Sequence, residues 1–458
     1  GDSSAGTSQK QNFCIALRTG TTYSLYGLGV VSGTARAEIL YKTLSTGGSD
    51  DLGDATWANT SNNQSASGTI NFNCFVYYAR TGRVYGVKTN GDVLRYDPAG
   101  SAAIVEQDVA LSTTTNVAQG LVHSKDDILY IPYDNKIAKN DNGSWTATAL
   151  TLPTHLYITS ICEYGNYLAI GAAPLSDYGS SVVYLWDRDA TLTTLSESID
   201  WGEGTLRILE QVEGRLIGIS YVGISGSALT GKMIFREYSG GTANIFKQFT
   251  SETTFSTTDL TITKQKVNNF LYFQMKIRLN GTTHQGLWKV GRLTPGAPFS
   301  VTMDRTPNND TALSASGTLT GFFLTGDYVF QSYTDSGFSL TKTDNAATFS
   351  VTGTYESLII NAGDSSKIKK LVSVTVMTEF LPADGQIVAK YRKDEETSYT
   401  TIFTNTTNSS ISFSAVKIVS SGANLPEFKE IDFRVESTGN AVITGLKVKF
   451  EVLDKNLS

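Results

Sequence analysis

Charged residues are scarce in this chain of 458 residues. They make up 17% of the sequence, against about 25% in typical soluble domains. The net charge of −6 is mild and acidic, so the composition does not favour binding to nucleic acid, which requires clustered Lys and Arg. Aromatic residues make up 10% of the chain, which excludes a disordered protein.

Cysteine and histidine are also rare. The three cysteines, Cys14, Cys74 and Cys162, are an odd number, which excludes a complete disulfide framework. Each stands in an apolar run, and we expect buried free thiols that pack as small hydrophobic groups. The three histidines lie far apart. No Cys-x-x-Cys or His-x-x-x-His pair is present, so we expect no transition-metal site.

Long apolar runs are absent as well. No stretch of about 18 or more apolar residues is present, so we expect no membrane-spanning helix. No signal peptide is recognised. The chain begins Gly-Asp-Ser-Ser, which we interpret as a processed N-terminus or a remnant of the expression vector.

What the sequence does contain is a repeated pair of short apolar strands joined by a polar turn. The turn contains Gly, Asn or Asp, which tolerate the positive φ angles of tight hairpins. The copies recur at roughly 40–60 residues, the spacing of propeller blades. They are residues 14–25, 75–87, 121–131, 161–170, 209–219, 264–273 and 322–330.

Further strands follow each hairpin. Residues 91–96 and then 103–107, for example, follow the second copy. Four strands per repeat is the blade of a propeller. We therefore predict a β-propeller of about seven blades over residues 1–362. Tandem sandwich domains are the alternative, and they are less favoured because each copy is too short for a sandwich core.

The pattern changes after about residue 362. Apolar and polar residues alternate in 372–376, 431–435 and 446–452. Alternation indicates strands with one wet face and one core face, as in a two-sheet sandwich. We predict a small antiparallel, jelly-roll-like β-sandwich over residues 363–458, which makes the whole chain all-β.

A second recurring feature lies between the third and fourth strands of several repeats. It resembles a degenerate Asp-box, whose pattern is Ser/Thr-x-Asp-x-Gly-x-Thr-Trp. We expect the Asp to cap its own turn and the aromatic residue to pack between blades. Asp-boxes occur in sialidases and in unrelated propellers, so this resemblance implies the fold rather than a function. The copies are residues 49–57, 140–145, 186–192 and 342–349.

Catalytic constellations are not evident. The Phe/Tyr-Arg-Ile-Pro signature of sialidases is absent near the N-terminus, and no phosphate-binding loop is present. Asp200 and Glu203 are a candidate carboxylate pair for a glycosidase, but acids that flank Trp201 and Gly202 are also typical of a solvated loop. We therefore predict that the protein is not an enzyme and needs no cofactor.

Two oxygen-rich loops leave structural calcium open as an alternative. Asp50, Asp51 and Asp54 cluster in one of them, and residues 140–142 form the other. Neither has the full spacing of a known calcium loop. Turn capping is the simpler interpretation of both.

The longer loops of the repeats are expected to share one face of the propeller. Function concentrates on long loops that a rigid scaffold holds in place. We predict a contact face that includes Tyr178, Trp201, Tyr221 and His284, whose rings suit stacking on sugar. Packing between blades or ordinary surface exposure is the alternative for each of the four.

The C-terminal segments 428–436 and 441–450 resemble the terminal sandwich of tailed-bacteriophage virion proteins. In that class a propeller with an appended sandwich occurs in tail and tail-tip components. The resemblance implies a structural or adhesive component of a tail or capsid appendage, located in the virion. It also implies other virion proteins as partners in a symmetric assembly, and a host-surface glycan or receptor as a further partner.

A protein of the extracellular space is the alternative. It would be a secreted or cell-surface propeller that binds carbohydrate or hydrolyses glycosides. In a eukaryotic secretory pathway, Asn-x-Ser/Thr sites such as Asn142 and Asn280 would carry glycans.

Overall fold

In the computed structural model of the protein, the described residues form 36 strands, and all regular elements among them are strands. For strands before Cys74 the structure describes the backbone alone. In this described part, no helix has the length and hydropathy needed to cross a bilayer. The structure describes all residues except 1–10, 20–21, 32–35, 46–57, 60–65, 68–69, 89, 98–103, 112–115, 175–178, 190–194, 224–230, 254–258, 280–281, 293–295, 308–316, 325–328, 335–337, 343–351, 358, 362–366, 379–380, 395, 407–413, 419–425, 440 and 454–458.

The chain divides into two compact units, Gly1–Asn345 and Ala346–Ser458. The first unit is built of seven sheets, and strands that follow one another in the chain pair antiparallel within each sheet, except that β5 pairs with β3. The first three sheets comprise β1 (Gln11–Thr19), β2 (Thr22–Val31), β3 (Arg36–Ser45), β4 (Ala58–Asn59) and β5 (Ala66–Ser67); β6 (Ile70–Tyr78), β7 (Arg83–Lys88), β8 (Asp92–Tyr96) and β9 (Ile104–Ala110); and β10 (Leu121–His123), β11 (Ile128–Tyr133), β12 (Lys136–Asp141) and β13 (Ser144–Thr151).

The four remaining sheets of this unit follow the same order. Six of the seven sheets have at least four described strands, and the last has three. They comprise β14 (Leu156–Tyr164), β15 (Tyr167–Pro174), β16 (Ser180–Trp186) and β17 (Glu197–Glu203); β18 (Thr205–Val212), β19 (Arg215–Val222), β20 (Lys232–Ser239) and β21 (Thr242–Thr250); β22 (Leu260–Val267), β23 (Phe270–Leu279), β24 (Thr282–Gly291) and β25 (Ser300–Arg305); and β26 (Thr318–Leu324), β27 (Val329–Thr334) and β28 (Phe338–Lys342).

The hairpin turns have the predicted chemistry. Val212 of β18 pairs with Arg215 of β19, which leaves a two-residue turn. Both turn residues have positive φ angles, 47° at Glu213 and 75° at Gly214. Such a turn matches the right-handed twist of the strands it joins. The same geometry recurs at Gly240 and Gly241, with φ of 63° and 87°.

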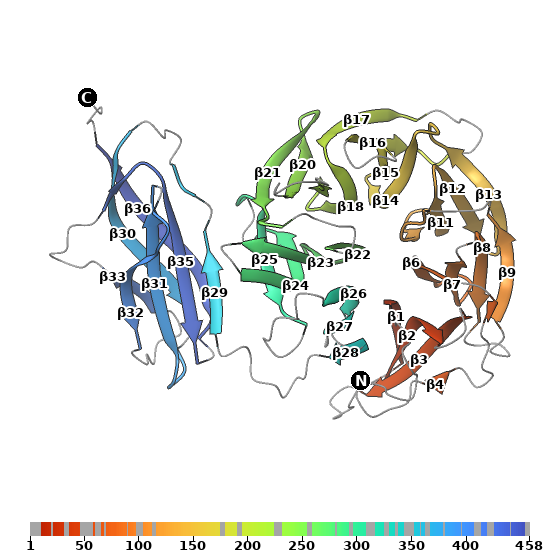
Figure 1. Ribbon diagram of the computed structural model, residues 1–458, viewed down its shortest axis with the longest axis horizontal. Coiled ribbons are helices and arrows are strands. Elements are labelled where there is room, and N and C mark those ends of the chain that lie inside the picture. The colour runs from red at the N-terminus through yellow and green to blue at the C-terminus, as the bar shows by residue number, and fades with distance from the viewer. Residues whose placement is uncertain are drawn as a thin grey trace. The chain divides into compact units, whose positions relative to one another are not determined.

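The seven sheets are arranged around a ring (Figure 1). The first strand of each sheet is the inner one, and inner strands of neighbouring sheets contact one another, as β14 and β18 do, and β18 and β22. The first and last sheets are joined in the same way, because β1 contacts both β6 and β26. The first unit is therefore a closed propeller of seven blades, as predicted.

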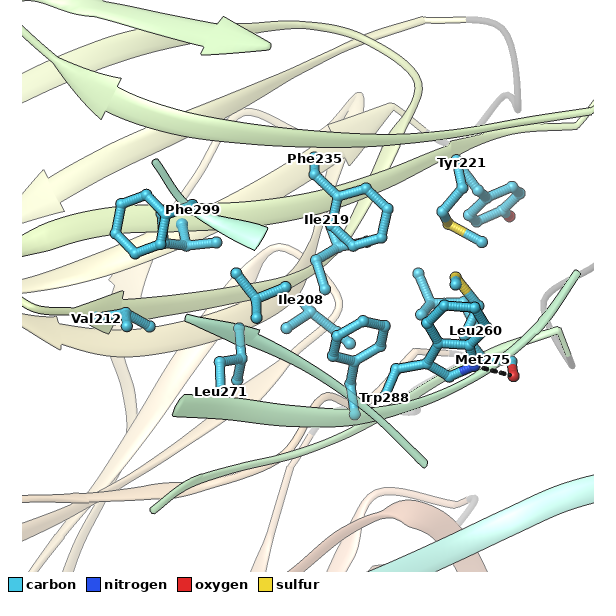
Figure 2. Packing of buried hydrophobic residues seen from close by; sticks show 14 of the residues in the cluster. Ile208, Val212, Ile219, Tyr221, Phe235, Leu260, Leu271, Met275, Trp288 and Phe299 are labelled. Carbon is cyan, nitrogen blue, oxygen red and sulfur yellow. Dashed lines mark hydrogen bonds between the residues drawn. The ribbon is translucent and has the colours of Figure 1, made fainter. Parts of the chain in front are cut away.

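The hydrophobic core of the propeller lies between neighbouring blades. In Figure 2, Ile208, Ile219 and Phe235 of the fifth blade pack against Leu271 and Trp288 of the sixth. A blade with neighbours on both sides has to bury both faces, so its middle strands have nearly continuous apolar sequences. In β19, seven of eight residues are buried.

The boundary between the units lies earlier than residue 362. β29 (Thr352–Glu356) pairs antiparallel with β35 (Ile431–Thr438), and Tyr355 lies opposite Val435. This segment was expected to end the propeller, and the structure places it in the second unit. Its short sequence, Thr-Gly-Thr-Tyr-Glu, fits a strand of either unit, and only the long-range pairing with β35 decides between them.

The second unit is the predicted antiparallel sandwich. One sheet has the order β29–β35–β31–β32, and in the other β30 pairs with β33, β34 and β36. Buried residues of both sheets form its core, among them Val376, Phe433 and Val435. The strands not yet located are β30 (Lys369–Thr378), β31 (Gln386–Lys393), β32 (Thr400–Asn405), β33 (Ser414–Ile418), β34 (Glu427–Phe428) and β36 (Ile443–Val452).

Candidate functional site

The side chain of Lys264 joins three blades inside the propeller. Lys264 lies on β22, the inner strand of the sixth blade. Its Nζ donates hydrogen bonds to the carbonyl oxygen of Ile161 on β14, at 2.8 Å, and to that of Leu209 on β18. The carboxylate of Glu210, also on β18, lies 3.0 Å from the same ammonium. Since β14 and β22 belong to blades that are not neighbours, the side chain has to pass through the inside of the ring.

The repeat explains why these groups meet. Ile161, Leu209 and Lys264 each stand three residues before the last residue of their strand, so they occupy equivalent positions in three blades. The lysine replaces an apolar residue at this position. A charge where the neighbouring copies are apolar is a signal present in the sequence, but the carbonyls that the lysine reaches are set by the ring.

The ammonium of Lys264 has no spare hydrogen-bonding capacity. Its side chain is 8% exposed, and that of Glu210 is 15% exposed. A buried charge has to be paired and hydrogen-bonded, and an ammonium has three N–H donors. Two carbonyls and one carboxylate occupy them, so this lysine ties blades together and is not available as a nucleophile or anion ligand.

A small polar cavity lies where the inner strands begin. Asn116, Tyr157 and Arg207 line it, together with Ile262 of β22. Its volume is about 20 Å³, enough for roughly one water molecule. Pockets that hold small organic ligands are larger, of the order of 300 Å³ or more. This cavity therefore suits a bridging water and not a sugar.

A second polar cluster joins the third and fourth blades. Arg188, which follows β16, donates from Nε to Oδ2 of Asp126 at 2.8 Å, and its Nη1 lies 3.0 Å from Nε2 of His123. The hydroxyl of Tyr130 donates to the same Asp126 oxygen at 3.2 Å. Because a guanidinium only donates, the His123 Nε2 accepts the hydrogen bond from Arg188.

The surroundings of this cluster keep the imidazole of His123 and the phenol of Tyr130 neutral. Burial, and after it the Arg188 guanidinium, holds the pKa of His123 below its ordinary value of 6.5. Burial and Asp126 raise the pKa of the Tyr130 phenol. His123 is only 1% exposed, so its imidazole faces protein groups and no substrate can reach it. The cluster is a clamp between blades.

Two of the four predicted contact residues are buried, and for them the prediction was wrong. Trp201 is 0% exposed and Tyr221 is 3% exposed. Trp201 lies on β17 and packs with Leu206 and Leu216 of the next blade. Tyr221 lies on β19 in the cluster of Figure 2. Both were expected in long loops, but they belong to strands whose side chains fill the space between blades.

The other two predicted contact residues have different outcomes. His284 is half-buried on β24, opposite Ile277 of β23. The segment 278–284 was expected to be a long loop, but the two strands extend to Leu279 and Thr282. Tyr178 lies outside the described residues. The structure therefore does not gather the predicted rings on one face, because two of them are inside the protein.

The oxygen-rich turn at 140–142 is used by the protein itself. Oδ1 of Asn140 accepts a hydrogen bond from the backbone N–H of Gly143 at 2.6 Å, and Asp141 pairs with Arg80 of the preceding blade at 2.8 Å. Trp145 then packs edge-on against Tyr85. Turn capping and packing between blades are confirmed at this copy. Asp50, Asp51 and Asp54 lie outside the described residues. Within the described part of the chain, no group of three or more His, Cys, Asp or Glu side chains is placed to hold a metal ion.

The candidate carboxylate pair does not form a site. Oδ1 of Asp200 accepts a hydrogen bond from the backbone N–H of Gly202 at 2.9 Å, so it caps its own bulge. Both acids lie on β17, the outermost strand of its blade. Glu203 lies 4.0 Å from the ammonium of Lys232. Nothing in this arrangement directs the two carboxyl groups toward a common substrate.

One sheet of the sandwich has a face of paired charges. Arg392 donates to Oδ2 of Asp432 from Nη2 at 2.5 Å, and Lys390 lies 2.8 Å from Glu436. The guanidinium of Arg392 also lies 4.8 Å from the ring centre of Tyr399. Burial and neighbouring acids raise the pKa of Tyr399 to about 12. The charges on this face are neutralised internally.

Comparison with known proteins identifies no family. No protein-family profile matches the chain, and no curated protein matches it. Solved structures with a similar fold include the Dos1 propeller. It shares 11% identity with this chain at a TM-score of 0.41, and the match covers 74% of this chain and 94% of that one. An exo-β-1,3-galactanase from Phanerochaete chrysosporium aligns over 95% of both chains at 10% identity and a TM-score of 0.32.

Raptor from Chaetomium thermophilum is a further structural neighbour. It shares 11% identity with 66% of this chain at a TM-score of 0.38, and the chain spans 24% of its length. Likenesses as remote as these three carry no function to this protein. The assignment of a propeller followed by a sandwich rests on the sheets and on the closed ring.

Proposed function

We propose that this protein is a structural component of a tailed-bacteriophage virion, in a tail or capsid appendage, and acts by protein–protein assembly. The observation that supports this role best is the state of the propeller interior. Lys264, a charged group that reaches across it, is saturated by Ile161, Leu209 and Glu210. An interior used for ties between blades suits a rigid platform.

Polar ties at several blade junctions support the same role. The hydroxyl of Tyr78 donates to the carbonyl oxygen of Asp127 in the next blade at 2.5 Å. Gln265 exchanges two hydrogen bonds of 2.7 Å with the backbone of Leu324 in the last blade. Each buried hydrogen bond contributes about 1 kcal/mol. Together such ties resist relative motion of the blades, as a component that transmits force in a particle requires.

The resemblance of the C-terminal sandwich to those of virion proteins supplies the biological setting. In this setting the partners are other virion proteins in a symmetric assembly, with a host-surface glycan or receptor as a second target. The protein would then act without a cofactor and without catalysis. Its place of action would be the virion.

The test is association with virus particles. We expect the protein to co-purify with particles in a fixed, symmetric copy number. Quantitative mass spectrometry of the purified particles measures this number. A monomer that is absent from particles and cleaves or binds glycans on an array would overturn the proposal. So would an intact mass that shows added glycan at sites such as Asn142, because this would place the chain in a eukaryotic secretory pathway.

A further inference from the structure

The strand β36 forms an edge of the sandwich. It runs over ten residues and pairs with β30 along its whole length, from Lys369 opposite Val452 to Thr378 opposite Ile443. Among the described residues it pairs with no other strand. None of its ten residues is buried. Within the described part of the chain, its second row of backbone N–H and C=O groups is unpaired and can accept a further strand.

Two lysines stand on the outer face of this edge strand. Lys447 and Lys449 are exposed and alternate with half-buried Val448, so both point away from the core. Neither makes an ion pair or a side-chain hydrogen bond with any described residue. The opposite sheet differs, because there Lys390 and Arg392 are both paired with acids. Unpaired positive charge is thus concentrated at the open edge.

Exposed apolar side chains accompany these lysines. Met377 on β30, which lies opposite Gly445 of β36, is 41% exposed. Val372 is 42% exposed because a bulge between Leu371 and Ser373 turns its side chain outward. The outer surface beside the edge thus combines lysine with apolar contact area, a combination that suits a protein partner.

We infer that β36 binds an extended acidic segment of another protein by strand addition. An added strand would lie about 4.8 Å from β36, and its residues on the outer face would lie directly opposite Lys447 and Lys449. Residues in alternate positions of a strand share a face. The segment therefore carries acids at alternate positions, and a neutral or basic residue opposite Glu451.

A second copy of the chain suits this edge less well than an acidic strand, because β36 contains a single acid, Glu451, and cannot place an acid opposite both lysines. Two copies of β36 paired antiparallel about a two-fold axis near Val448 would place lysine opposite lysine, and facing like charges are destabilising. Edge lysines prevent self-association in this way. They do not prevent pairing with an acidic strand, so the same lysines can disfavour self-association and select an acidic partner. This inference names a partner class for the proposed assembly role and rests on it.

The experiment uses the full-length protein and a labelled peptide, Thr-Lys-Val-Glu-Val-Glu-Thr, whose Lys and two Glu match Glu451, Lys449 and Lys447 in antiparallel register. Binding is measured by fluorescence anisotropy at low salt. Hydrogen exchange of the β36 amides is measured with and without the peptide. We expect binding together with slower exchange in β36. A scrambled peptide with adjacent glutamates should bind at least about tenfold more weakly, because it cannot pair both lysines in one register.

Two variants of the protein and one changed peptide decide between edge pairing and general attraction. Lys447→Glu/Lys449→Glu should weaken binding by about tenfold or more, since two attractive cross-strand pairs become repulsive. The same variant should bind a peptide with Lys in place of Glu. The matched control is Lys370→Glu on β30, which lies a strand further from the added chain, at about 9.6 Å, and should change binding less than twofold.

Two results would overturn the inference. One is evidence of attraction to any anionic surface. This evidence would be a loss of peptide binding in Lys370→Glu as large as that caused by the changes on β36, or binding to vesicles that contain phosphatidylserine as strong as binding to the peptide. The other is peptide binding that leaves β36 exchange unchanged. If the chain associates with particles in fixed copy number but binds no acidic peptide, the edge inference fails and the proposed structural role stands.

Discussion

Trp201 lies directly against Gly218 of the next blade. A Cβ added at Gly218 would meet the indole ring at 2.5 Å from Cζ2 and 2.6 Å from Cε2. Trp201 is on β17 of the fourth blade and Gly218 on β19 of the fifth. The glycine thus provides the space into which the largest side chain of the neighbouring blade fits. A residue that looks like a sugar-binding aromatic in the sequence is a packing element between blades.

Gly218→Ala should therefore destabilise the propeller. The ring atoms within 2.7 Å of the added Cβ cannot move without disturbing the packed cluster, and overpacking of this kind costs about 1–3 kcal/mol. The free energy of unfolding can be followed by tryptophan fluorescence, because all five tryptophans lie in the first unit. Gly86→Ala is the matched control, since its nearest neighbour is the flexible end of Leu94 at 3.3 Å. An equal loss in both variants would contradict the packing role of Gly218.

Lys264→Met should be among the most destabilising single changes in the propeller. It leaves the Glu210 carboxylate buried without its ammonium, and breaking a buried pair on one side costs about 3–5 kcal/mol. Urea denaturation followed by tryptophan fluorescence measures the loss. The double variant Lys264→Met/Glu210→Leu should recover part of the stability, because it removes both charges. Lys266→Met, at an exposed position of the same strand, should have little effect.

The clamp around His123 should make the propeller sensitive to acid. Its pKa in the folded protein lies below 6.5, while the unfolded chain takes up a proton at its ordinary pKa. The unfolded state therefore binds more protons, and the stabilisation present above pH 6.5 is lost as the pH falls through the folded pKa. The stability difference between wild type and His123→Gln should shrink from pH 7 toward about pH 5. His155→Gln, at an exposed position, is the control for the loss of a histidine.

Native Cys74 and Cys162 should resist alkylation. Both are buried, and burial raises the pKa of the Cys74 thiol to about 12 and raises that of Cys162 further. The thiolate is the reactive form, so iodoacetamide at pH 8 should leave both residues unmodified in the folded protein. Peptide mass spectrometry after labelling locates the modified residues. Labelling in urea should modify both, and rapid native labelling of either would show that its blade opens.

The predicted and observed structures agree where local pattern decides. Turn residues such as Gly214 and Gly240, between apolar strands, predict hairpins because few other residues accept their φ angles. The regular recurrence of the hairpin predicts blades, since a four-stranded sheet cannot bury its faces alone. The alternation in β35 predicts a sandwich for the same local reason. These features depend on residues close in the chain.

The candidate site depends on residues far apart in the chain, and here the sequence misleads. Trp201 and Tyr221 stand near polar and glycine-rich segments, which predicts exposure, but neighbouring blades cover them. Lys264 is a charge at a position that is apolar in neighbouring copies, but the sequence around it does not show which groups its ammonium reaches. Its role becomes visible only when the ring brings Ile161 and Glu210 to its ammonium.

The sequence by itself determined the all-β class, the repeating hairpin and the change of pattern toward the C-terminus, because periodicity and turn chemistry act over a few residues. Only the tertiary structure decided which faces are buried, where β29 belongs, and which charges are paired. Those outcomes depend on which blade or strand lies alongside, and Lys264 and Lys449 show the difference. Both are lysines on β-strands, yet packing makes one an internal tie and leaves the other at an open edge.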